Sequence, residues 1–255
     1  MFISLGKTDI GLKRQVNQDY FSIGTIYDAS WTIVCDGLGG EKAGDIASKI
    51  ATKVIEHHIV NNYQTGMNSS EIKNMLSMSF NLANSKIFDM ARENKNYERM
   101  ATTAIISFVV GYSLYVAHVG DSRIYIIEDE NIIQLTKDDS LVQVLVEKGT
   151  LSKDEAKKHP QRNYLIKAIG IKKEIDVNCQ NINIKPDNLI LMCTDGLYNY
   201  ADENIIKEMV DEISPNDLPD RFIELALNNG GCDNITAVVM FDPDYRGKGS
   251  VNGNG

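Results

Sequence analysis

Residues 102–136 read TTAIISFVVGYSLYVAHVGDSRIYIIEDENIIQLT, and this stretch decides the fold class. It holds four runs that are rich in β-branched and aromatic residues, as is typical of strands. Short turns separate the runs, at residues 111–112, 120–121 and 129–130. Connections this short join antiparallel strands, because a parallel pair needs a much longer crossover. The stretch therefore predicts four consecutive antiparallel neighbours.

Patterns on either side extend the prediction to the whole chain. Two amphipathic helices are expected over residues 42–60 and 70–93, where apolar residues recur every three or four positions. The remaining expected elements are strands at 2–8, 21–26, 31–35, 175–184, 188–194 and 234–241, and helices at 202–212 and 218–229. Because strands group with strands and helices with helices, the sequence predicts an α+β fold, with two antiparallel sheets packed together and helices outside.

The length and composition favour a single domain over residues 1–241. With 255 residues, 43% of them hydrophobic, the chain can bury one large core. The segment 136–170 interrupts the β region with a helical pattern, and Ser152 and Glu155 have the spacing of a capping box inside it. Residues 242–255 are rich in glycine and asparagine, and we expect them to form a disordered tail.

Charge and apolar patterning exclude several classes of partner. A formal net charge of −9 argues against nucleic acid, because phosphate backbones are held by clustered lysine and arginine. No apolar run approaches the roughly 20 residues of a membrane span, and the N-terminus lacks the pattern of a secretory signal. We therefore expect a cytoplasmic protein. The four widely spaced cysteines, Cys35, Cys179, Cys193 and Cys232, are expected to be buried and reduced.

Four aspartates recur at the ends of apolar strand runs: Asp36, Asp121, Asp195 and Asp233. For a lone Asp-Gly pair, a hairpin turn is at least as good an explanation. That explanation weakens with repetition, and the segments after Asp36 and Asp195 lead toward helices instead of hairpins. If the strands end at one edge, these acids converge there, and their mutual repulsion requires a bound cation.

The chemistry of these candidate ligands points to phosphate ester hydrolysis. All are oxygens, which favours Mg²⁺ or Mn²⁺ over zinc or copper. Gly37 would allow its carbonyl to approach a metal closely. Two such ions can lower the pKa of a shared water and direct it at phosphorus. Arg14, five residues ahead of Asp19, offers a guanidinium suited to phosphate, although alone it would be read as a surface charge.

Seven stretches occur in an order that carries a family resemblance. They are RQVNQD (14–19), VCDGLGGEKAGDIAS (34–48), ATTA (101–104), VGDSRIY (119–125), the segment 135–170, LMCTDGL (191–197) and CDNITAVV (232–239). Together they resemble the PPM family of metal-dependent serine/threonine protein phosphatases, the type 2C phosphatases, in their compact bacterial form. The resemblance covers about residues 4–241. It implies an αββα sandwich and one catalytic domain over 1–241, in agreement with the layers expected above.

The resemblance also implies roles for individual residues. Asp36 would bridge two metal ions as a catalytic residue, and the Gly37 carbonyl would bind the second ion. Asp195 and Asp233 would complete the first ion's ligands, and Asp19 would lie near the second. The segment 136–170 would be the family's flap beside the active site, with a plain surface helical hairpin as the alternative.

Further roles follow from the same resemblance. Arg14 would hold the substrate phosphate as a catalytic residue, and a third ion would be shared by Asp121 and Asp195. Leu38 and Glu41 stand where some members carry histidine. The general acid is therefore not assigned to a side chain, and a metal-bound water is the default candidate.

The sequence thus predicts a cytoplasmic phosphatase that hydrolyses phosphoserine and phosphothreonine with a metal-activated water, using Mn²⁺ or Mg²⁺. Its expected partners are phosphorylated proteins, including a serine/threonine kinase and its substrates, with no nucleic acid and no membrane. We expect a monomer. The alternative is a catalytically silent module on the same fold that binds phosphoproteins or a regulator. A structural calcium-binding protein would carry one D-x-D-x-D-G loop, and this sequence has none.

Overall fold

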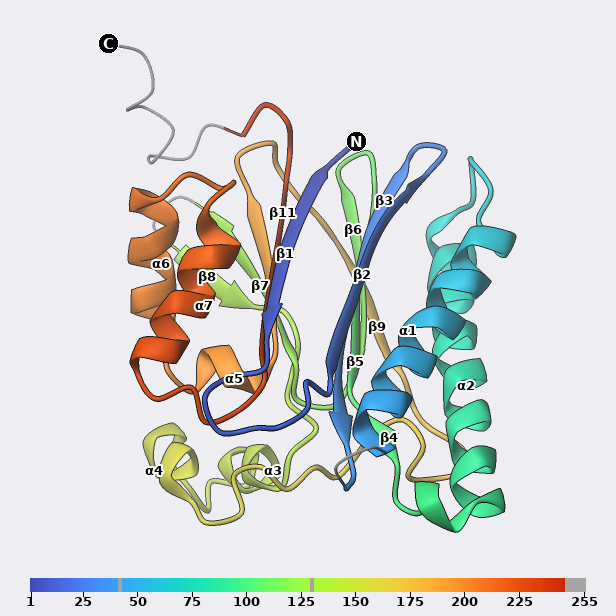
Figure 1. Ribbon diagram of the computed structural model, residues 1–255. Coiled ribbons are helices and arrows are strands. Elements are labelled where there is room, and N and C mark those ends of the chain that lie inside the picture. Colours follow the sequence, from blue (N-terminus) through green and yellow to red (C-terminus); the bar gives the residue numbers. More distant parts are fainter. Residues whose placement is uncertain (41–42, 129–130, 246–255) are drawn as a thin grey trace.

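Two antiparallel β-sheets lie face to face in the computed structural model, which describes residues 1–40, 43–128 and 131–245 (Figure 1). The first sheet has the strand order β1 (Ile3–Asp9), β11 (Ile235–Phe241), β10 (Leu189–Cys193), β7 (Arg123–Glu128) and β8 (Asn131–Gln134). The second has the order β2 (Asp19–Ile26), β3 (Ala29–Leu38), β5 (Ala104–Val110), β6 (Ser113–Val119) and β9 (Asn178–Asn183). A short strand, β4 (Ala101–Thr102), pairs with the end of β3. The expected sheet pair is therefore confirmed.

Alternating side chains divide the apolar residues of each strand between two cores. On β3, Val34 faces the layer between the sheets, whereas Ile33 and Cys35 pack toward the helices. On β11, Val238 faces the other sheet and Val239 faces its own helices. Successive strand residues point to opposite faces, so the central strands are apolar on both sides. Each sheet must consequently be covered by helices, which gives the αββα order.

The helices cover the outer face of each sheet (Figure 1). The second sheet is covered by α1 (Ala43–Asn62) and α2 (Ser69–Glu93), and η1 (Lys95–Tyr97) follows α2. The first sheet is covered by α5 (Asp195–Tyr198), α6 (Glu203–Glu212) and α7 (Leu218–Asn228). Polar caps fix where two of these helices begin: Asn68 and Glu71 form a capping box before α2, and Asp202 accepts two backbone N–H groups at α6.

The chain changes sheets at Gly120, which corrects one sequence expectation. Strands β5 and β6 form a hairpin, and so do β7 and β8, but β6 and β7 belong to different sheets. The turn at 120–121 is therefore a crossing, and the four strands are two hairpins. Gly120 has φ of +107°, and a Cβ there would lie 2.6 Å from the Thr103 side chain. Only glycine accommodates this sharp departure toward the opposite sheet. The turn at 129–130 lies outside the described residues.

The segment 136–170 forms the expected helical insertion. It contains α3 (Leu141–Glu147) and α4 (Lys153–Lys158). The capping box of Ser152 and Glu155 is confirmed at the start of α4. The insertion lies at the same end of the sandwich as β4 and α5 (Figure 1).

The ordered chain continues past the boundary expected at residue 241. Asp242 is buried and accepts a hydrogen bond from the Tyr112 hydroxyl at 3.0 Å, and the Tyr245 ring packs 6.0 Å from that of Phe241. These contacts hold residues 242–245 against the domain. The rest of the expected disordered tail, 246–255, lies outside the described residues.

Two further sequence expectations concern the cysteines and membrane spans. Cys35 and Cys193 are buried in strands, whereas Cys179 is half-buried and Cys232 is exposed, because Cys232 lies in the loop before β11. In the described part of the chain, no helix is both long enough and apolar enough to span a bilayer.

Candidate active site

Five aspartates reach the candidate site from both sheets. Asp19 begins β2, Asp121 follows β6, Asp195 is the first residue of α5, and Asp233 precedes β11. Asp36 lies inside β3 instead of at its end, which corrects the sequence expectation. The strand continues to Leu38 because β4 pairs with its last residues. All five acids nevertheless lie at the same end of the sandwich, because the segments that carry them approach one another there.

Local contacts bring these aspartates together. The β2–β3 register places Asp19 directly opposite Asp36. The Thr194 hydroxyl donates a 2.8 Å hydrogen bond to Asp19 Oδ2, so Asp195, the next residue, is adjacent to Asp19. The hydrogen bond to Asp233 raises the pKa of Arg14, and the charges of Asp233, Asp195 and Asp36 raise it further, so these three acids lie near the guanidinium. The convergence proposed from the sequence is therefore present.

Asp19 is held by two threonines that sequence reasoning missed. Thr194 and Thr236 both donate hydrogen bonds to Asp19 Oδ2, at 2.8 and 2.7 Å, and Thr8 bonds to the Thr236 hydroxyl at 2.8 Å. Asp19 is only 4% exposed, and its other oxygen, Oδ1, has no hydrogen-bond partner among the described residues. A buried carboxylate oxygen without a donor is costly. Its free oxygen is a candidate acceptor for a ligand.

The Asp36 backbone is fixed by a second pair of threonines. The Asp36 N–H donates to Thr103 Oγ1 at 2.9 Å, and the Asp36 carbonyl accepts from the Thr102 hydroxyl at 2.8 Å. Thr103 is itself bonded to Ser122 at 2.7 Å. These bonds occupy the backbone of Asp36 and hold the strand in place, so the carboxylate is presented from a rigid support.

Two glycines allow the acid-bearing segments to approach one another. A Cβ on Gly37 would collide with the Gly44 carbonyl oxygen, and a Cβ on Gly196 would collide with the Asn234 carbonyl oxygen. The first approach packs the start of α1 against β3. The second packs α5 against the segment that carries Asp233. The glycine after each acid is thus required for close packing.

Substituting Gly196 with alanine is expected to reduce the free energy of unfolding by at least about 2 kcal/mol, because the added methyl group meets backbone instead of a movable side chain. Chemical denaturation measures this change. Gly40→Ala is the matched control, since a Cβ at Gly40 has no atom within 4 Å, and it should change stability by less than about 0.5 kcal/mol. Equal stability of both variants would contradict the close packing of α5.

Burial and mutual repulsion disfavour the ionised form of these acids. Burial, and next the charge of neighbouring Asp19, raises the pKa of Asp36 well above 3.8. Burial raises the pKa of Asp19 to about 7 and that of Asp121 to about 8, and nearby Asp195 adds to both shifts. Burial and Asp233 raise the pKa of Asp195 to about 6, against the opposing charge of arginines. The nearby arginines therefore do not offset the repulsion among these acids.

The residues present fit divalent cations. The donors are carboxylate and carbonyl oxygens, which suit hard ions, and the free Asp19 oxygen and the shared repulsion both favour a bound positive charge. Across residues 1–40, 43–128 and 131–245, no three acidic, histidine or cysteine side chains are arranged to hold an ion by themselves. Any ion here would complete its coordination with water or backbone carbonyls, as Mg²⁺ commonly does.

Arg14 lies at the edge of the site, on a loop that Asn234 secures. Its guanidinium contacts Asp233 at 2.7 Å and is half exposed. Asn234 donates to the carbonyls of Ile10 and Val16 and accepts the N–H of Gln18, at 2.8 to 3.1 Å. One buried asparagine thus fixes the loop that carries Arg14.

The insertion is anchored beside Asp121. The Asp139 N–H donates to the Gly120 carbonyl at 2.9 Å, and the Asp139 side chain accepts the Gly120 N–H at 3.1 Å. Arg123 pairs with Asp138 at 2.7 Å and lies 3.7 Å from the centre of the Tyr198 ring. The insertion therefore adjoins the site. Its influence on substrate choice stays a prediction.

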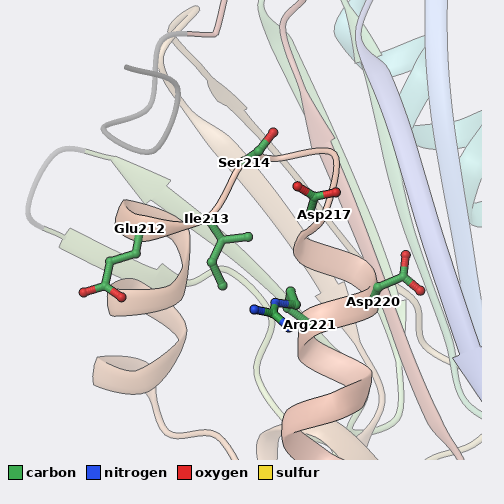
Figure 2. Close-up of a pocket in the computed structure, with 6 residues that line it drawn as sticks. All are labelled: Glu212, Ile213, Ser214, Asp217, Asp220 and Arg221. Carbon is green, nitrogen blue, oxygen red and sulfur yellow. The ribbon is translucent and has the colours of Figure 1, made fainter. Parts of the chain in front are cut away.

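One of the two motif positions named from the sequence, Leu38, has no ionisable side chain. Leu38 is half-buried at the end of β3. Glu41 lies outside the described residues. A separate hollow between the end of α6 and the start of α7 is lined by Glu212, Ile213, Ser214, Asp217, Asp220 and Arg221 (Figure 2). It contains none of the site residues.

Comparisons with known proteins agree with this geometry. Residues 12–226 match the family model described as Protein phosphatase 2C. The chain is 31% identical over 245 residues to the serine/threonine phosphatase Stp of Listeria monocytogenes, covering 95% of this chain and 96% of that protein. The structure resembles that of the serine/threonine phosphatase Stp1 from Staphylococcus aureus, with a TM-score of 0.88, 32% identity, and coverage of 94% and 95%. It also resembles the catalytic domain of the phosphatase PstP in complex with two manganese ions, with a TM-score of 0.80, 28% identity, and coverage of 94% and 99%.

Proposed function

The chain belongs to the protein phosphatase 2C family, and from this membership we propose that it dephosphorylates phosphoserine and phosphothreonine in proteins with the help of divalent cations. The observation that carries the proposal is the convergence of five aspartates beside an arginine at the edge of the site. Burial raises the pKa of Asp19, Asp36, Asp121 and Asp195, and one oxygen of Asp19 has no hydrogen-bond partner among the described residues. Such a cluster is unfavourable alone and favourable around cations.

The ions would be held by oxygens from both sheets. Two would lie among Asp36, the Gly37 carbonyl, Asp195 and Asp233, with Asp19 close by, and a third could be shared by Asp195 with Asp121. When bound, they would lower the pKa of a coordinated water and neutralise charge on the phosphate. The manganese in the related PstP structure supports Mn²⁺, and Mg²⁺ suits the same donors.

Arg14 and Leu38 have different parts in the proposed reaction. Water oxygen forms a bond to phosphorus while the bond to the serine or threonine oxygen breaks, and that oxygen takes up a proton. Arg14 binds and orients the phosphate through its N–H groups, after releasing Asp233. Leu38 has no proton to give, and a water held by the cations would be the default proton donor to the leaving oxygen.

The partners follow from this chemistry. The substrates are phosphorylated proteins, including a serine/threonine kinase and its targets, in the cytoplasm. The protein acts as a monomer with one catalytic domain, and neither nucleic acid nor a membrane takes part. The insertion at 136–170 acts as a flap that affects which substrates enter.

Purified protein is expected to hydrolyse para-nitrophenyl phosphate and a phosphothreonine peptide when Mn²⁺ is supplied. Excess EDTA should lower both rates by more than about a hundredfold, since removing the ions leaves the site without a nucleophile of low pKa. Released phosphate measures turnover. No turnover of either substrate with Mn²⁺ or Mg²⁺ would refute the proposed activity.

The silent-module alternative predicts a different combination of results. It would bind the phosphothreonine peptide and Mn²⁺ without releasing phosphate. Calorimetry on the same samples separates the two possibilities. Arg14→Ala is a useful second variant, because it should lower the kcat/KM for the phosphorylated substrate while leaving every carboxylate of the site in place.

A further inference from the structure

A groove of about 470 Å³ opens next to the candidate active site. Its walls are the end of α2, the segment 98–101 and residues 170–171 at the base of the insertion. Both α2 and β4 reach the same end of the sandwich as the insertion helices (Figure 1). The groove contains none of the five aspartates.

Strand β3 links the groove to the site, because it carries both Asp36 and the groove residue Leu38. Leu38, which lines it, is paired with Ala101, and the preceding Gly37 is paired with Thr102. Leu38 lies two strand residues from Asp36, or about 7 Å. An extended peptide whose phosphorylated residue is at the site would therefore reach the groove within roughly two or three residues.

The groove is held in a fixed shape by α2. Asn84 is fully buried, and its Oδ1 accepts the Gly170 N–H at 2.8 Å while its Nδ2 donates to the carbonyls of Lys172 and Lys173. Ile169 and Thr102 exchange two backbone hydrogen bonds. A preformed groove loses less ordering free energy on binding than a mobile one.

Its chemistry combines an apolar floor with a positive rim. Phe88 is half-buried, and Ile171 is 49% exposed. The Arg92 guanidinium lies 5.7 Å from the centre of the Phe88 ring. Arg99 is exposed and has φ of +66°, a conformation that non-glycine residues rarely adopt and that often marks functional positions. Glu98 is the one acid that lines the groove, within the described residues.

We propose that this groove binds the substrate chain beside the phosphorylated residue and selects an acidic side chain, next to an apolar one, at that position. Two arginines on a protein of net charge −9 form a local positive site, and complementary charge favours an acidic segment. The apolar floor suits a peptide side chain. The inference rests on the proposed phosphatase function and adds a class of substrate to it.

The test compares phosphothreonine peptides that differ in one residue. A peptide set places glutamate, lysine or alanine at each position from four before to four after the phosphothreonine. The expected result is a kcat/KM about tenfold higher for glutamate than for lysine at positions on one side only. For each protein, the kcat/KM on a peptide is divided by the kcat/KM on para-nitrophenyl phosphate. This compound is too small to fill the groove. Equal values for all peptides would overturn the inference.

Charge reversal in the groove provides the decisive comparison. The double variant Arg92→Glu with Arg99→Glu should exchange the preference, so that the lysine peptide becomes the better substrate. Glu98→Gln should shift preference slightly further toward glutamate, by about twofold. Arg221→Glu, at the separate hollow of Figure 2, is the matched control and should retain the original preference.

These results also separate failure of the groove from failure of the proposed function. If the unsubstituted protein hydrolyses para-nitrophenyl phosphate and the double variant still prefers glutamate peptides, the groove inference is wrong and the proposed function stands. An original protein with no turnover of any substrate disproves the function. Thermal unfolding of each variant confirms that these exposed substitutions leave the fold intact.

Discussion

Asp36→Asn is expected to lower phosphatase activity by at least about a thousandfold while leaving the protein folded. Asparagine has almost the same volume as aspartate but lacks its negative charge. The Asp36 backbone, bonded to Thr102 and Thr103, makes no use of the carboxylate, so its support is unchanged. The charge, in contrast, is central to the five-acid cluster. Initial rates with Mn²⁺ and a titration of Mn²⁺ by calorimetry measure the loss of turnover and of affinity.

In the metal-free protein, Asp36→Asn is expected to preserve or increase stability, in contrast to the loss of activity that is expected with metal. Because Asp36 repels Asp19, Asp195 and Asp121, its neutralisation should leave the chelated protein as stable as the original, or more stable. Asp89→Asn, an exposed acid on α2, is the matched control and should change neither activity nor stability. Retained activity in Asp36→Asn would exclude Asp36 from the reaction, and unfolding would show a structural part instead.

The metal-free protein is expected to lose stability as the pH rises from 5.5 to 8.5. The folded-state pKa values of Asp195, Asp19 and Asp121 are about 6, 7 and 8, against 3.8 for a free aspartate. Between pH 4 and 8 the folded chain therefore binds more protons than the unfolded chain, so the free energy of unfolding decreases with pH. We expect the melting temperature in EDTA to fall by at least about 5 °C across this range.

Saturating Mn²⁺ should cancel this dependence, because a cation binds the ionised carboxylates of the folded state and hardly the unfolded chain. The increase in melting temperature on adding Mn²⁺ is then larger at pH 8.5 than at pH 5.5. Asp121→Asn removes one titrating acid and should flatten the slope in EDTA, whereas Asp89→Asn should not. A melting temperature that rises with pH in EDTA would show that these acids are not crowded in solution.

Most elements of the fold follow from local sequence patterns, and the exceptions have physical causes. The helices over 43–62 and 69–93 match their apolar repeats closely. The crossing at Gly120 could not be distinguished from a hairpin, because a glycine and a connection of two or three residues are compatible with both. What separates them is the packing of Gly120 against Thr103, a contact between distant residues. Turn chemistry fixes how sharply a chain bends, while the choice of sheet depends on the whole core.

The candidate site shows the same division. The repetition of Asp-Gly at strand ends was enough to single out Asp36 and Asp195. A glycine follows each of these aspartates because a Cβ on Gly37 or Gly196 would collide with a neighbouring backbone carbonyl. The supporting threonines Thr194 and Thr236 carried no signal of their own, since threonine is common in strands. Their role depends on their lying on neighbouring strands beside Asp19. The short helix at Asp195 was also missed, because four residues are too few for a periodic pattern.

Because the acids come from both sheets, ligand affinity and the cohesion of the two layers are thermodynamically linked. Asp19 and Asp36 belong to one layer, and Asp195 and Asp233 to the other. A ligand that binds acids from both layers holds the layers together, so they can separate only after the ligand is released. By the same linkage, a core substitution far from any acid that allows the two sheets to separate should also weaken ligand binding.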